Sequence, residues 1–146
     1  MRCGTLRADR IVVHKARREM LLLLGNSLLR TYRIALGRDP IGHKEREGDG
    51  RTPEGRYIID WRNPKSRYFL SLHISYPNEV DRARAAALGV DPGGDIMIHG
   101  LPPAFKDYGA AHREFDWTEG CIAVTDEEIE EIWRAVPQGA PIQIKP

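Results

Sequence analysis

The sequence predicts a small α+β domain of mainly β structure, in which an antiparallel sandwich or barrel-like sheet carries two short helices. Two patterns support this prediction. Apolar side chains alternate from Tyr68 to Ile74, which is typical of a strand with one buried face. A capping box formed by Thr125 and Glu128 opens a stretch with helical apolar periodicity, which Pro137 ends. Strand and helix signals therefore occur in one short chain.

The remaining strands are predicted from short apolar runs between turn residues. A hairpin is expected where strands 20–24 and 28–36 flank Gly25 and Asn26. Alternation in its second strand is imperfect, so we expect a bulge there or a strand buried on both faces. A turn is expected at 63–66, and further strands at four places: 11–13, 57–61, 95–99 and 142–144.

A second helix is predicted over residues 79–88. Asn78 precedes it as a suitable N-cap, and Gly89 follows its last turn, where a left-handed backbone conformation commonly ends a helix. Two long connections, 37–55 and 101–117, have little regular pattern, and the first is rich in glycine. Loops of this kind often shape sites, so we expect both to flank a cleft.

Length and charge limit the class of protein. The 146 residues suit one domain, spanning 1–146, with about the first eight residues disordered. A net charge of +1, from 22 basic and 21 acidic residues, gives no reason to expect nucleic acid as a partner. The longest aliphatic run, 20–24, is far shorter than the roughly 18 residues that span a membrane. No export signal is visible, and Cys3 is interpreted as an unremarkable terminal residue.

The candidate catalytic residues are a histidine at the end of a predicted strand and a cysteine further along the chain. A nucleophilic thiolate needs a base and backbone N–H groups that hold the oxyanion. His99 supplies an imidazole, which would lower the pKa of a nearby thiol, and Gly120 allows a tight turn before Cys121. Gly100 follows the histidine, and Thr118 adds a hydroxyl. The competing interpretation is a cysteine that is simply a small buried apolar residue.

This order of residues resembles the L,D-transpeptidase catalytic domain, also called the YkuD domain. Its motif runs from His-Gly through a variable loop to Ser or Thr, one residue, and Gly-Cys, which His99-Gly100 and Thr118-x-Gly120-Cys121 match. Segments 35–37, 52–57 and 74–78 resemble the same family, so the resemblance covers about residues 9–146. It implies a small β-rich fold and an enzyme that joins or trims peptidoglycan stem peptides.

The resemblance also implies roles for these residues. Cys121 is the nucleophile and His99 the general base, while the amides of Gly120 and Cys121 form part of the oxyanion hole. The carbonyl of Gly100 orients the imidazole. The acyl group passes to an amine, with hydrolysis by an L,D-carboxypeptidase or amidase as the alternative. No cofactor is implied. A carbapenem-type β-lactam would react with the same sulfur, and the periplasm or cell envelope is the expected location.

Four residues are candidates for substrate binding. Tyr76 and Asn78 are expected along the donor cleft, and Trp117 as an apolar platform or, equally, a core residue. His73 is expected either in the site or as a half-buried structural histidine. His112, in the loop before the cysteine, is expected to be exposed to solvent rather than to form a wall of the site.

Two positions depart from the family pattern. Glu119 stands where many relatives carry His or Lys, and Ala123 stands where many carry Arg or Asn. In those relatives the arginine is well placed to engage a substrate carboxylate, so the usual mode of donor recognition is in question here. The end of the motif, 120–125, is similar to the murein-trimming branch of the family.

Two other classes of protein compete with the enzyme. A zinc site would draw on His73, His99, His112 and Cys121, but the spacing includes no Cys-x-x-Cys or His-x-x-x-His pair, so no metal is predicted. A non-catalytic wall-binding module would keep the cleft and carry an inert thiol. Metal analysis and the rate of thiol alkylation distinguish these classes.

Overall fold

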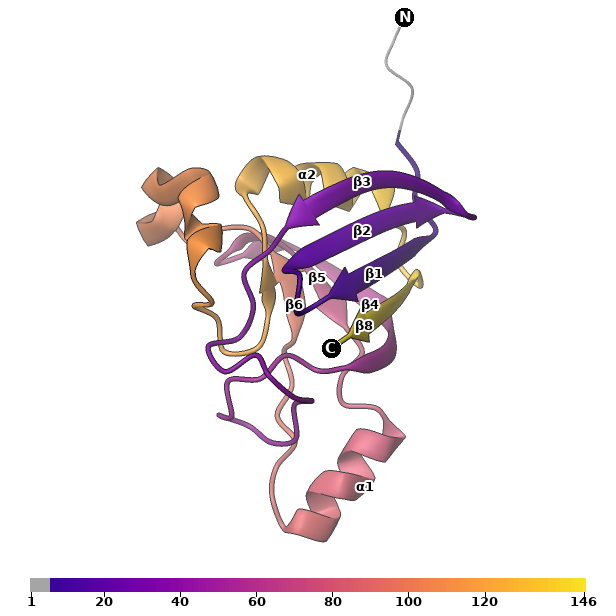
Figure 1. Ribbon diagram of the computed structural model, residues 1–146, viewed down its shortest axis with the longest axis vertical. Coiled ribbons are helices and arrows are strands. Elements are labelled where there is room, and N and C mark those ends of the chain that lie inside the picture. The colour runs from indigo at the N-terminus through magenta and orange to yellow at the C-terminus, as the bar shows by residue number, and fades with distance from the viewer. Residues whose placement is uncertain (1–5) are drawn as a thin grey trace, which may run out of the picture.

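The computed structural model describes residues 6–146 as one strongly curled sheet, with one α-helix packed against it and another that projects away from it (Figure 1). Eight strands follow the order β3-β2-β1-β8-β4-β5-β6-β7. The pairs β1–β8 and β6–β7 are parallel, and all other pairs are antiparallel. The predicted class, α+β with mainly β structure, is confirmed. Cys3 and the first part of the expected disordered terminus lie outside the described residues, whereas Ala8 is buried.

The elements have the following bounds. The strands are β1 (Arg10–His14), β2 (Glu19–Leu24), β3 (Ser27–Arg33), β4 (Gly55–Ser66), β5 (Phe69–Ile74), β6 (Met97–His99), β7 (Ile122–Ala123) and β8 (Pro141–Lys145). The helices are α1 (Glu79–Leu88), α2 (Asp126–Ala135) and the 3₁₀ segment η1 (Pro103–Glu114). Both α-helices begin with a capping box, as their N-cap residues Asn78 and Thr125 suggest.

Strand β4 joins the two halves of the sheet. Its first residues, Gly55 to Ile58, pair with β8, and from Ile59 onwards it pairs with β5. The register shifts between Ile59 and Trp61, which is where a bulge bends a strand. This bend lets one continuous sheet curl around an apolar core.

The core lies inside the curl and is closed by α2. Strands from both halves contribute fully buried aliphatic side chains, among them Ile11, Val13, Leu22, Ile59, Leu72 and Ile98. Helix α2 adds Ile129 and Ile132 from its apolar face. Figure 1 shows α2 along one end of the sheet, while α1 projects from the opposite end. The strands that carry the candidate catalytic residues are therefore held by a well-packed core.

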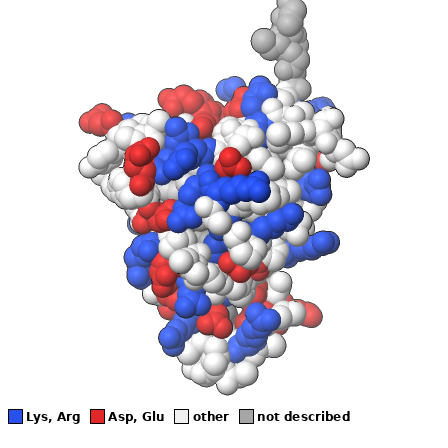
Figure 2. All heavy atoms as spheres, in the orientation of Figure 1, with Lys and Arg blue, Asp and Glu red and all other residues white. Residues whose placement is uncertain are grey.

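Cations gather on the outer face of the sheet. Arg10, Arg33 and Arg56 are exposed on β1, β3 and β4. Across the strands Arg33 pairs with Glu19, whereas the partners of Arg10 and Arg56 are uncharged. Figure 2 shows the resulting band of Lys and Arg over this face, with fewer acidic side chains between. The net charge of the whole chain is therefore near zero, while this face of the sheet carries a local excess of positive charge.

Several predicted boundaries were wrong. The turn expected at 63–66 is part of β4, which continues to Ser66; Pro64 lies where the register shifts, a position that does not need its missing N–H. The strand expected from Asp95 begins at Met97, because Asp95 adopts a φ of 56°. The connection 101–117 contains 3₁₀ turns interrupted at Gly109. The hairpin bulge is confirmed between Leu22 and Leu23.

From residue 6 to residue 146, the helices are all too short or too polar to cross a membrane.

The capping box of α2 gives a stability prediction. Replacing Thr125 with Ala removes the acceptor of the Glu128 amide and should lower the free energy of unfolding by about 1 kcal/mol. Urea unfolding measures this loss. Glu130→Ala, an exposed change on the same helix, is the control and should unfold like the wild type. Equal stability of Thr125→Ala and the control would contradict the assigned cap.

Candidate active site

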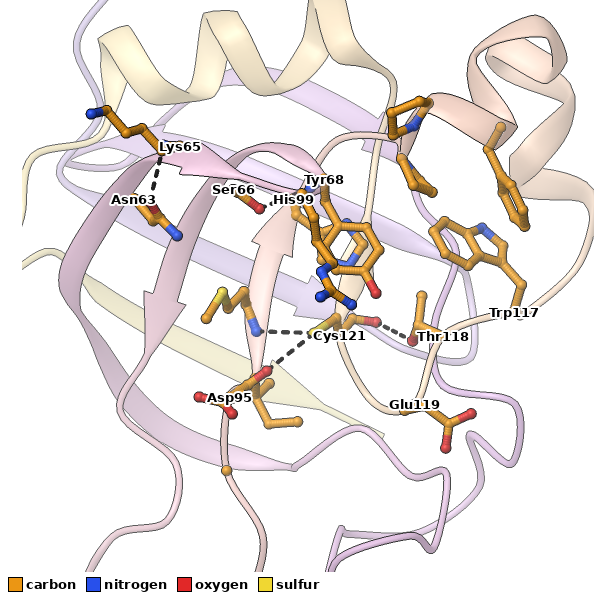
Figure 3. Close-up of a pocket in the computed structure, with 17 residues that line it drawn as sticks. Asn63, Lys65, Ser66, Tyr68, Asp95, His99, Trp117, Thr118, Glu119 and Cys121 are labelled. Carbon is orange, nitrogen blue, oxygen red and sulfur yellow. Dashed lines mark hydrogen bonds between the residues drawn. The ribbon is translucent and has the colours of Figure 1, made fainter.

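Pairing of β6 with β7 brings the two halves of the sequence motif together. Ile98 pairs with Ile122 and His99 with Ala123, so the end of one strand lies beside the residues that follow Cys121. His99 and Cys121 line the same cleft, whose volume is about 1030 Å³ (Figure 3). Thr118 and Trp117 line it too. The predicted histidine and cysteine are thus neighbours in one pocket.

The Cys121 thiol is half-buried and hydrogen-bonded to backbone groups. It donates to the carbonyl oxygen of Asp95 at 3.3 Å and accepts from the amide of Met97 at 3.4 Å. Burial raises the pKa of Cys121 to about 11, although the Met97 amide opposes this shift. The sequence led us to expect a lowered thiol pKa. In the structure desolvation outweighs every stabilising contact to the thiolate, so the resting sulfur is a neutral thiol.

His99 is buried and held in one tautomer. Its Nδ1 lies 2.7 Å from the carbonyl oxygen of Gly100, a contact that is a hydrogen bond only if Nδ1 carries the proton. Nε2 is then unprotonated and able to accept a proton. The ring stacks on Tyr68 with a centroid distance of 4.2 Å and contacts Trp117 at 5.9 Å. Burial lowers the pKa of His99 to about 4, so the imidazole is neutral at physiological pH.

Gly100 is fixed against the start of α2. A Cβ at this position would lie 2.6 Å from a carboxylate oxygen of Asp126 and 3.0 Å from Ile129. The same carboxylate accepts the amide of Leu101 at 2.8 Å. The carbonyl that orients His99 is therefore held by a close approach that only glycine permits.

The Thr118 hydroxyl organises the turn before Cys121. It donates to the carbonyl of Cys121 at 2.7 Å and accepts the amide of Gly120 at 3.1 Å. The Gly120 amide, expected to face an oxyanion, is thus already engaged. Among residues 6–146 no acceptor is found for the amide of Cys121, which leaves it as the donor beside the sulfur. Gly120 itself has a φ of 139°.

Three of the four candidate substrate-binding residues are not among the residues that line this cleft. The Tyr76 hydroxyl donates to the carbonyl of Pro92 at 2.7 Å, and the Asn78 side chain caps α1. His73 contacts Asp60 at 2.5 Å and stacks on Trp61. The lining of the cleft includes none of the three, whereas it includes Trp117.

His112 is buried, so the expectation that it is exposed was wrong. The Trp117 indole donates to its Nδ1 at 3.2 Å, and burial lowers the pKa of His112 to about 4. The 3₁₀ turns of η1 fold it under the tryptophan that contacts His99. Within the described part of the chain, no three His, Cys, Asp or Glu side chains gather as metal ligands would.

The two long connections differ in their relation to the cleft. Pro102, Pro103 and Phe105 of the second connection line it. The first connection, 37–55, does not line it and instead supports the cysteine turn from behind, where Gly37 pairs with Thr118. Our expectation that both border the opening was therefore wrong for the first.

The hairpin between β4 and β5 forms a wall of the cleft that the sequence analysis missed. Its lining residues are Asn63, Lys65, Ser66, Arg67 and Tyr68. Only the pairing of β5 with β6 carries this hairpin to His99. The alternating pattern after residue 68 predicted a strand, but no local motif predicted its neighbour in the sheet.

The raised thiol pKa predicts how Cys121 reacts with alkylating agents. In a Cys3→Ala background, the rate of alkylation by iodoacetamide should keep rising with pH towards about 11, because only the thiolate reacts. Free cysteine, as the control, levels off above its own pKa of about 8.5. A rate that is already maximal below pH 7 would instead indicate a thiolate–imidazolium pair.

The fit of Gly120 predicts a large loss of stability on substitution. A Cβ at Gly120 would lie 2.7 Å from the carbonyl oxygen of Arg51, so Gly120→Ala must shift backbone and should cost about 1–3 kcal/mol. Gly25→Ala is a matched control, because its φ is also positive but nothing lies within 4 Å of the added carbon. Equal losses in urea unfolding would show that crowding at Gly120 is unimportant.

The chain is similar to known proteins over nearly its whole length. The family model of the YkuD domain, the L,D-transpeptidase catalytic domain, matches residues 8–144. The Escherichia coli K12 protein named "Putative L,D-transpeptidase YafK" is 34% identical over 112 residues, which cover 75% of this chain and 37% of YafK. The chain thus spans well under half the length of that relative.

Solved structures share the fold at low identity. The helical cell shape determining protein Pgp2 from Campylobacter jejuni matches with a TM-score of 0.66 and 22% identity, over 94% of this chain and 47% of Pgp2. L,D-transpeptidase 3 from Mycobacterium tuberculosis, solved in complex with a faropenem-derived adduct, matches with a TM-score of 0.63 and 14% identity, over 95% of this chain and 60% of that one. With the family model matching nearly all of its length, the chain belongs to the L,D-transpeptidase catalytic domain family.

Proposed function

We propose that this chain is the catalytic domain of a cysteine-dependent L,D-transpeptidase that acts on peptidoglycan stem peptides. The observation that carries the proposal is the tautomer of His99. With Nδ1–H bound to Gly100, Nε2 is the basic nitrogen, and it belongs to a side chain that shares the cleft with Cys121. A nucleophile, a base and a group that orients the base are the parts that acyl transfer needs.

Acylation starts from a neutral pair. As the sulfur attacks the carbonyl of a stem-peptide L–D bond, His99 accepts the thiol proton, the C–S bond forms, and the negative charge moves to the carbonyl oxygen. Collapse breaks the C–N bond, and His99 returns the proton to the departing amine of the D-residue. The pKa of about 4 keeps His99 in its basic form throughout the neutral range.

The amide of Cys121 is the proposed donor to the oxyanion. The Thr118 hydroxyl fixes this amide indirectly, because it binds the carbonyl of Cys121 and the amide of Gly120 in one turn. Thr118 and Gly120 therefore position the nucleophile and its adjacent N–H group. A preorganised donor of this kind stabilises the tetrahedral intermediate without reorganisation during the reaction.

The thioacyl-enzyme passes its acyl group to an amine, which restores the thiol and forms a new amide. Transfer to water instead gives a shortened peptide, the outcome expected of a trimming enzyme. The cell envelope is the proposed location because peptidoglycan lies there. A carbapenem would acylate the same sulfur, since attack on the strained lactam carbonyl forms a C–S bond and opens the ring with transfer of the proton to its nitrogen.

Intact-protein mass spectrometry tests the mechanism. With a stem tetrapeptide donor, wild type should gain the mass of the acyl group, and Cys121→Ala should gain nothing because it lacks the sulfur. Cys3→Ala is the matched control and should behave like wild type. An adduct that persists in Cys121→Ala would falsify the assignment, and donor binding with no adduct in wild type would indicate a non-catalytic wall-binding module.

His99 should govern the rate of acylation. Loss of a general base costs about 10²–10⁴ in rate, so His99→Gln should form the adduct that much more slowly. A thermal melt of the variant checks that the buried site has kept its fold. Products separated by chromatography, with and without an added amine acceptor, distinguish transpeptidation from hydrolysis.

A further inference from the structure

The cleft is electrically asymmetric. Its lining contains two cations, Lys65 and Arg67, which both belong to the hairpin between β4 and β5. Its two carboxylates, Asp95 and Glu119, lie on other segments. Figure 3 shows Lys65 and Glu119 at opposite sides of the view, with Cys121 between them. An anionic substrate group in the cleft is therefore attracted towards the hairpin that carries Lys65 and Arg67 and repelled from the segments that carry the carboxylates.

The charged groups of the cleft differ in whether another group of the protein interacts with their charge. Glu119 accepts two hydrogen bonds from Arg38, at 3.1 and 3.2 Å, which offset its charge. The charge of Asp95 contributes to raising the pKa of Cys121, so this carboxylate acts close to the sulfur. Among the interactions of residues 6–146, no ion pair or hydrogen bond engages the charged group of Lys65 or of Arg67; the backbone amide of Lys65 donates to the Asn63 side chain at 3.0 Å. The cationic wall is available to an incoming anion.

The backbone around Arg67 is held firmly. The Ser66 hydroxyl accepts the amide of Tyr68 at 3.0 Å and a hydrogen bond from the Ser71 hydroxyl at 2.6 Å. Phe69 adopts a φ of 74°, a strained conformation for an aromatic residue and one that is found most often at functional sites. Tyr68, the next residue after Arg67, stacks on His99. Arg67 is thus attached one residue away from the ring that covers the base.

We propose that Arg67 binds the terminal carboxylate of the D-residue that the donor peptide loses, an inference that rests on the proposed function. That carboxylate belongs to the residue that directly follows the scissile carbonyl, and only the C–N, N–Cα and Cα–C bonds separate the two carbon atoms. Asp95 repels it from its own side of the sulfur. A guanidinium receives a carboxylate in a two-pronged, charge-assisted contact. Arg67 therefore selects donors that end in a free carboxylate.

Acylation of Cys121 by such a donor needs no further reactant. The thiol proton passes through His99 to the leaving nitrogen as the C–S bond forms and the C–N bond breaks. The D-residue departs as a free amino acid with its carboxylate on Arg67. A donor whose D-residue continues into another amide lacks this anion, and so loses the contact.

Two donors test the inference: a stem tetrapeptide with a terminal carboxylate, and the same peptide with a terminal amide. Wild type should prefer the acid by about 10- to 100-fold in kcat/KM, the value of one charged hydrogen-bonding contact. In Arg67→Gln the ratio of acid to amide should fall towards one, and Arg67→Lys should restore part of it. Arg82→Gln, an exposed change on α1 outside the cleft, should keep the wild-type ratio.

The outcomes separate the two proposals. If wild type forms no acyl-enzyme with either donor, the proposed function fails. If wild type turns over the acid and the amide equally, the assignment to Arg67 fails while the function stands. A preference that survives unchanged in Arg67→Gln also overturns the assignment. Melting temperatures of all variants show whether a loss of rate reflects unfolding.

Discussion

The parallel pairing of β6 with β7 is the constraint on which the site depends. Both strands are very short, yet they place His99 and the residues after Cys121 side by side. Neighbouring segments hold the pairing: Ala123 bridges to Ala35, and the amide of Val124 donates to the carbonyl of His99 at 3.0 Å. Since each strand is hydrogen-bonded on both sides, slippage of the register would break contacts in several parts of the sheet.

Two buried lysines hold the segment that packs against the turn before Cys121. Lys15 donates to the carbonyls of Gly42 and Thr52 at 2.9 and 2.6 Å, and Lys44 donates to Asp49 at 2.9 Å. These contacts fix connection 37–55, whose Arg51 carbonyl lies against Gly120. Burial lowers the pKa of Lys15, and its carbonyl and carboxylate partners offset part of that desolvation. Buried polar contacts, from Lys15 outside this long connection and Lys44 within it, thus hold it in place as strand pairing does elsewhere.

Local signals in the sequence predicted most of the framework. Capping residues located both α-helices, because an N-cap acts within one turn, and the motif around Cys121 predicted that this cysteine and His99 belong to one site, which agrees with their shared cleft. The rest depended on contacts between distant segments. Nothing near Tyr68 or Arg67 indicates that their hairpin borders the cleft. Similarly, the charge pattern of the connection 37–55 gave no sign that its one lysine, Lys44, is buried.

The thiol pKa was predicted in the wrong direction for a related reason. A histidine near a cysteine is a feature of the sequence, but the desolvation that raises the pKa of Cys121 to about 11 arises only from packing. The hydrogen-bond partners of Tyr76 and Asn78 also depend on packing. Polar residues beside a helix start were plausible substrate contacts, yet both are satisfied inside the scaffold, by Pro92 and by the cap of α1.

Burial of Cys121 has a consequence for its chemical durability. Peroxides oxidise the thiolate, and a thiol with a pKa of about 11 holds that form in only about one molecule in ten thousand at neutral pH. An unshifted cysteine holds it in a few per cent of molecules. The neutral resting pair therefore protects the sulfur from sulfenic acid formation while the cleft is empty. In the proposed mechanism, the sulfur becomes nucleophilic only when an acyl donor reaches it and the imidazole accepts its proton.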